Sequence, residues 1–98
     1  MGYLLYGQPP EEIEVDDRAL AHIKLVMIAK LRRNESFAFS FAHNLDGEDG
    51  RSTVWVHPAI ALRFRFSESQ QPPINRAWLD QLVAAANSVD GLRLLPEP

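Results

Sequence analysis

The chain has 98 residues, of which 46% are hydrophobic and 23% charged. This length supports a single domain, residues 1–98, with one modest core, and it excludes a nucleotide-binding domain plus a separate substrate domain. The sequence has no cysteine, which excludes a disulfide framework, a thiolate zinc site and a cysteine nucleophile. The formal charge of −3, from 10 basic and 13 acidic residues, argues against a generally basic nucleic-acid binder but leaves room for a local basic patch.

The apolar segments are short. The longest run, residues 25–29, is far below the length that spans a bilayer. Residues 1–6 lack the basic region and the long apolar stretch of a signal peptide. We therefore expect no membrane partner and a cytoplasmic location.

The first third of the chain predicts two short strands and a helix. Residues 3–6 and 12–15 are the strands, separated by a glycine- and proline-rich turn. Asp16 is placed to cap a helix that runs to about residue 33, with basic residues in its last turn. Asn34 suits the left-handed position that ends a helix.

The remainder predicts three strands, a second helix and a last strand. The strands are residues 37–43, 52–57 and 60–66, joined by an acidic loop at 44–50 and by a tight turn at Pro58 and Ala59. Asn75 is placed to cap a helix to about residue 87, and residues 92–95 form the final strand. The order ββα-βββ-αβ predicts an α+β fold, a mostly antiparallel sheet with both helices packed on one face.

Strand register predicts the two faces of that sheet. If the turn at Pro58 has two residues and the acidic loop closes from His43 and Arg51, Trp55 lies beside Phe39. The predicted core face is then Phe37, Phe39, Phe41, Trp55, Ile60, Leu62, Phe64 and Phe66. The opposite face is small and partly apolar, comprising Ala38, Ser40, Ala42, Ser52, Val54, Val56, Ala61, Arg63 and Arg65.

Two apolar surfaces predict contact with a partner. The small-residue face lacks the long polar side chains typical of a sheet face left to water. In the first helix, Leu25, Val26 and Ile28 fall outside the core stripe. We therefore predict a partner surface at Leu25, Ile28, Val54 and Val56 and a homodimer. The alternatives are that the sheet face is an ordinary open one and that the chain itself covers the helix residues.

The sequence contains no recognisable catalytic, cofactor or metal motif. Its three histidines are not at metal-ligand spacing, the loop at 44–50 lacks the glycine and glutamate of a calcium loop, and no nucleotide or serine-hydrolase signature occurs. We predict no catalytic, cofactor-binding or metal-binding residues. The basic residues carry a second hypothesis, that phosphates are contacted by Lys30, Arg32, Arg33, Arg51, Arg63 and Arg65. The alternative is that the cluster at 30–33 only complements the end of its helix.

Several segments resemble a family of short, uncharacterised actinobacterial proteins, many of which are labelled "ATP-dependent DNA ligase". These segments are IEVDDRALAH at 13–22, AKLRRNESF at 29–37, RSTVWVHP at 51–58, PINRAW at 73–78 and GLRLLPEP at 91–98. The label implies a lysine nucleophile in a K-x-D-G motif. Lys24 and Lys30 are the only lysines, and neither lies in such a motif. The resemblance therefore implies a link to DNA metabolism without ligase chemistry.

These observations lead to two hypotheses. The first is a non-catalytic small interaction module, homodimeric and without cofactor. The second is an accessory protein that binds DNA or RNA.

Overall fold

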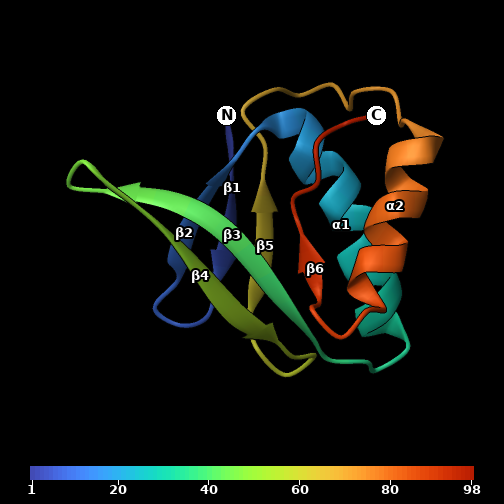
Figure 1. Ribbon diagram of the computed structural model, residues 1–98, viewed down its shortest axis with the longest axis horizontal. Coiled ribbons are helices and arrows are strands. Elements are labelled where there is room, and N and C mark those ends of the chain that lie inside the picture. Colours follow the sequence, from blue (N-terminus) through green and yellow to red (C-terminus); the bar gives the residue numbers. More distant parts are fainter.

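The computed structural model describes residues 1–98, the side chain of Leu45 excepted. Figure 1 shows its elements, which are β1 (Gly2–Tyr6), β2 (Glu11–Val15), α1 (Asp17–Arg32), β3 (Phe37–Leu45), β4 (Glu48–Val56), β5 (Leu62–Arg65), α2 (Arg76–Ala86) and β6 (Leu92–Arg93). The predicted order ββα-βββ-αβ and the α+β class are confirmed. In the described part of the chain, no helix has the length and apolar character needed to cross a membrane.

The strands form two three-stranded sheets, β2-β1-β5 and β4-β3-β6. All pairs are antiparallel except β3 with β6. The expected pairing of residues 60–66 with 52–57 is wrong, because β5 pairs with β1. The tight turn does form, since the Ile60 amide donates to the His57 carbonyl. The Gly7 amide then donates to the Ala61 carbonyl, which starts the ladder between β5 and β1.

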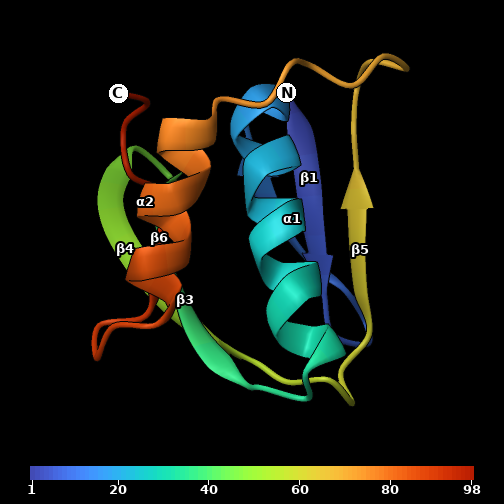
Figure 2. The same cartoon turned by 90° about the vertical axis from the view of Figure 1, so that its right-hand side faces the viewer.

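The helices lie side by side against the sheets (Figure 2). They run in the same direction, because His22 of α1 contacts Asn75 at the start of α2, and Lys30 contacts Asn87 at its end. The Asp16 carboxylate accepts from two amides of the first turn of α1, and the Asn75 side chain accepts from the Trp78 amide. Both predicted caps are therefore confirmed.

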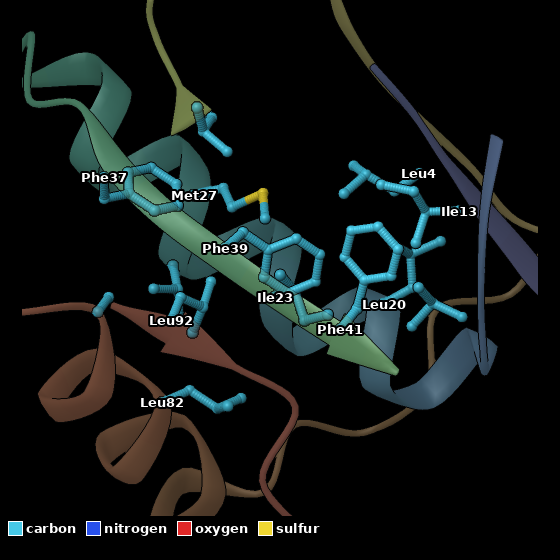
Figure 3. Close-up of a cluster of buried hydrophobic side chains, with 14 of the residues drawn as sticks. Leu4, Ile13, Leu20, Ile23, Met27, Phe37, Phe39, Phe41, Leu82 and Leu92 are labelled. Carbon is cyan, nitrogen blue, oxygen red and sulfur yellow. The ribbon is translucent and has the colours of Figure 1, made fainter. Parts of the chain in front are cut away.

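The core lies between the helices and the sheets, and β3 crosses its centre (Figure 3). Phe37, Phe39 and Phe41 are all buried, as predicted. They are surrounded by residues from every layer, among them Leu4, Ile13, Leu20, Ile23, Met27, Leu82 and Leu92.

The register of the β3–β4 hairpin differs from the expected one by one residue. Phe39 pairs with Val54 rather than with Trp55. The reason is the turn, which contains only Asp46 and Gly47, both with positive φ (53° and 82°), the geometry favoured in two-residue hairpins. A shift of one residue exchanges the faces of a strand. Val56 is consequently buried at 1% exposure, whereas Trp55 is 59% exposed.

Candidate ligand-binding face

The outer face of sheet β4-β3-β6 points away from the core. Because side chains alternate along a strand and Phe39 faces inward, the register assigns these residues to the outer face: Ala38, Ser40 and Ala42 of β3, Arg51, Thr53 and Trp55 of β4, and Arg93 of β6. A hollow of about 590 Å³ lies on this side of the sheet, and we call it the outer-face groove. It is lined by Ser40, Phe41, Ala42, Arg51, Thr53, Asp90, Arg93 and Leu94.

Trp55 is the largest exposed aromatic residue of this face. It pairs with Ala38 across the strands, so no bulky neighbour stands opposite its ring. The Tyr6 hydroxyl donates to the Trp55 carbonyl, which ties the backbone of β4 to β1. Burial raises the pKa of the Tyr6 phenol, although a backbone hydrogen bond from His57 opposes the shift. The Trp55 backbone is thus hydrogen-bonded to β1, while its indole ring is exposed to solvent.

Two arginines supply positive charge to the groove. Arg51 and Arg93 are exposed, and within the described part of the chain neither makes an ion pair. Between them lie the hydroxyls of Ser40 and Thr53, which are hydrogen-bonded at 2.8 Å. The groove thus offers two cationic groups, the carboxylate of Asp90, hydroxyls and, at one end of the same face, an aromatic ring.

The predicted phosphate-contacting residues are dispersed, and only Arg51 lies in the groove. Lys30 is buried at 8% exposure, and its ammonium is held by Asn87 Oδ1 at 2.8 Å and by Glu35 at 3.2 Å. Arg33 pairs with Glu35 as well. Lys30 is therefore a structural residue at the α1–α2 contact.

The other predicted phosphate contacts lie on different surfaces. Arg32 is exposed at the end of α1. Arg63 and Arg65 lie on the outer face of the other sheet, where Arg65 is 3.6 Å from Glu12 and lies over the Tyr3 ring.

Only half of the predicted partner surface is exposed, because the observed register of β4 differs from the expected one. Val56 is buried and Val54 packs against the core, because both lie on the inner side of β4. Placing them on the open face was therefore wrong. Leu25 and Ile28 remain on the surface of α1, at 36% and 38% exposure, but Val26 is part of the core.

The histidines have structural contacts. His22 is fully buried, with Nδ1 2.7 Å from the Arg18 carbonyl and Nε2 accepting from the Asn75 amide at 2.8 Å. Since the amide can only donate, the proton lies on Nδ1. His57 Nδ1 accepts from the Ala59 amide at the turn.

His43 Nε2 is 2.8 Å from the Ser52 hydroxyl, but its buried Nδ1 has no partner. A serine–histidine relay requires a third group to orient the histidine, and this pair has none. Among the described residues, no group of three or more His, Asp or Glu could hold a metal ion.

Sequence reasoning missed Trp55 and Arg93 as members of the outer face. The available signal was the Asp46-Gly47 dipeptide, which is typical of a two-residue hairpin turn and would have placed Trp55 outside. No comparable signal exists for Arg93, because its position depends on a two-residue parallel contact between β6 and β3.

Comparisons with known proteins identify the family. A family model described as "Domain of unknown function (DUF7882)" matches residues 1–97. The chain therefore belongs to this family. No curated protein and no solved structure matches the chain.

Proposed function

We propose that this member of the DUF7882 family is a non-catalytic binding module that holds single-stranded nucleic acid on the outer face of sheet β4-β3-β6. The observation that carries the proposal is the combination of an exposed Trp55 with two unpaired arginines, Arg51 and Arg93, on one face. Proteins that bind single strands combine a cationic groove with aromatic rings on which bases stack.

The layout of the groove favours a single strand over a duplex. Trp55 and Arg51 are four residues apart on β4, about 14 Å at 3.4 Å per residue. One extended single strand of nucleic acid can therefore contact both side chains. The floor between them has only small side chains and hydroxyls, as in Ala38, Ser40 and Thr53. A phosphate oxygen accepts hydrogen bonds from both arginine and hydroxyl donors.

The proposal is confined to binding. Ligase chemistry would need a lysine nucleophile in a K-x-D-G motif, and neither lysine lies in such a motif. Lys30 is buried in the α1–α2 contact. Lys24 is also on α1, and its ammonium lies over the ring of Phe66, the residue that follows β5. The link to DNA metabolism that the sequence resemblance implies is compatible with an accessory role of this kind.

The test is fluorescence anisotropy with labelled single-stranded DNA and RNA oligonucleotides, with the matching duplex as competitor. Measurements start at ~50 mM salt, where phosphate contacts are strongest. We expect binding to a single strand that excess duplex does not displace. Unchanged anisotropy with both oligonucleotides would refute the proposal, and binding of an acidic peptide instead would assign the groove to a protein partner.

Three variants locate the site: Trp55→Ala, Trp55→Phe and Arg51→Ala, the last of which should weaken binding by removing a phosphate contact. Trp55→Ala removes the aromatic ring, so we expect weaker binding of the oligonucleotide. Trp55→Phe keeps an aromatic ring on which a base can stack, so we expect it to retain binding. The matched control is Arg32→Ala, which removes an exposed arginine from the end of α1, on another element. An equal loss in Arg32→Ala and Arg51→Ala would point to non-specific attraction rather than to this groove.

A further inference from the structure

The outer face of the other sheet, β2-β1-β5, carries two columns of opposite charge. Register places Tyr3 beside Glu14 and Arg65, and Leu5 beside Glu12 and Arg63. The residues that alternate with them, such as Leu4 and Ile13, face the core. The outer face therefore has an acidic column on β2, an apolar column on β1 and a basic column on β5. We call this six-residue surface the striped face.

The charges of the striped face are only partly paired within the chain, where Arg65 forms an ion pair with Glu12 and the Tyr3 hydroxyl donates to Glu14. Arg65 and Glu12 are 3.6 Å apart, yet their side chains are 45% and 59% exposed. Arg63 is exposed and makes no ion pair in the described part of the chain. Arg63 and Leu5 also line a shallow hollow of about 230 Å³ at the end of the face.

The order of the columns makes the face complementary to itself. Neighbouring strands lie about 4.8 Å apart, so the acidic and basic columns lie about 10 Å apart on either side of β1. When two copies stack face to face about a two-fold axis parallel to β1, the left and right sides are exchanged. The acidic column of each copy then lies over the basic column of the other, and the apolar columns meet in the centre. A two-fold axis across the strands would instead place like charges together.

From this arrangement we propose that the striped face binds a second copy of this chain and forms a two-fold symmetric dimer. Two-fold dimers use the same patch on both subunits and require a patch that complements itself. Here complementarity comes from charge, because Leu5 is already buried and offers little apolar area. The dimer is therefore weak and sensitive to salt, since exposed charges are screened over about 10 Å at 0.1 M ionic strength.

The surface differs from the apolar patch of Leu25 and Ile28 on α1. A dimer held by apolar contacts is not weakened by salt, because salting-out ions strengthen burial of apolar surface. Salt dependence and substitution therefore distinguish the two surfaces.

Sedimentation velocity over a concentration series, at low and at high salt, tests the proposal. We expect the wild-type chain to associate at high-micromolar concentration in low salt and to dissociate as salt is added. The variant Arg63→Glu with Arg65→Glu should weaken association by about tenfold or more, because like charges facing each other across an interface are strongly unfavourable. Glu12→Arg with Glu14→Arg should do the same.

Restoring the pattern provides the decisive comparison. The quadruple variant, with all four charges exchanged, has the same two columns in reversed order and should regain self-association. The two double variants mixed in equal amounts should form a heterodimer. Ile28→Asp serves as the control and should leave association unchanged.

Three results would overturn the proposal. These are a wild-type monomer throughout the concentration range, association that persists at high salt, and a dimer that Ile28→Asp abolishes but the charge variants do not. Circular dichroism of each variant verifies the fold, and if a double variant fails to fold, wild-type salt dependence and the quadruple variant still decide the question.

Discussion

The contribution of Trp55 and the groove arginines to nucleic-acid binding can be separated quantitatively. Stacking of a base on an aromatic side chain contributes about 1–3 kcal/mol. Since every 1.4 kcal/mol is a tenfold change in affinity, Trp55→Ala should weaken binding by about 5- to 150-fold. The ring makes no charge contact, so the salt dependence of the remaining binding should stay as in wild type.

The arginines should have the opposite signature. For single strands the slope of log K against log salt is about −0.7 for each phosphate neutralised. Two contacts, from Arg51 and Arg93, predict a slope of about −1.4. Arg51→Ala or Arg93→Ala should halve it, and the double variant should bring it close to zero.

The assay is an anisotropy titration of one labelled oligonucleotide at four or more salt concentrations. Thermal unfolding of each variant accompanies it, and because all three side chains are exposed we expect small changes in stability. A Trp55→Ala variant with wild-type affinity would refute the stacking argument. A slope unchanged by the double arginine variant would show that phosphates are bound elsewhere.

Two further predictions concern the contacts that hold α1, α2 and the C-terminal segment together. His22→Leu leaves the half-buried Asn75 amide without its acceptor, so urea unfolding should show a loss of about 1–3 kcal/mol in stability; a change close to zero would contradict this role. Hydrogen bonds from Arg18, and then from Asn75, lower the pKa of Glu97 from 4.5 to about 2. A lowered carboxyl pKa stabilises the fold above the unfolded pKa and loses that effect as the pH falls. The urea midpoint of wild type should therefore exceed that of Glu97→Gln at neutral pH, and the difference should vanish between pH 4.5 and about 2; a pH-independent difference would refute it.

The sequence predicts local features of this fold well. Asp16 and Asn75 cap the helices because each has a short polar side chain directly before an apolar stripe, and its oxygen can accept from the free amides of the first turn. Asn34 has the expected left-handed conformation, with a φ of 62°. The phenylalanines of β3 are at alternate positions, so they all lie on one face of the strand, and this face is the one that is buried. Each of these features depends on neighbours in the chain.

Features that depend on distant partners were not predictable in the same way. The alternating Leu62 and Phe64 of β5 are compatible with pairing to β4 and equally with pairing to β1. Only the three-dimensional structure shows which of the two strands is the partner. The hairpin register depends on whether the turn has two residues or seven. The structure has two, so the ladder continues to Leu45 and Glu48, through a segment that is polar enough to resemble a loop. The Asn44 side chain donates to the Asp49 carboxylate across this ladder at 2.7 Å.

The wall of the outer-face groove depends on one glycine, which a matched pair of substitutions can test. Gly91 has a φ of +78°, and a Cβ at this position would lie 2.6 Å from the Ala38 carbonyl oxygen. This close approach brings β6 beside β3 and so places Arg93 in the groove. Gly47, at the hairpin turn, has a similar φ of +82° but nothing within 4 Å of its Cβ position.

Both Gly→Ala variants impose a left-handed alanine, which costs about 1–2 kcal/mol, but only Gly91→Ala adds a clash with backbone. We expect Gly91→Ala to lower the free energy of unfolding by about 1–3 kcal/mol more than Gly47→Ala does. Gly91→Ala should also weaken oligonucleotide binding, whereas Gly47→Ala should keep wild-type affinity. Urea unfolding and anisotropy of the two variants measure both effects. Equal losses of stability would mean that β6 can move away from Ala38 without cost, and the groove would then lack the rigid wall on which the binding proposal relies.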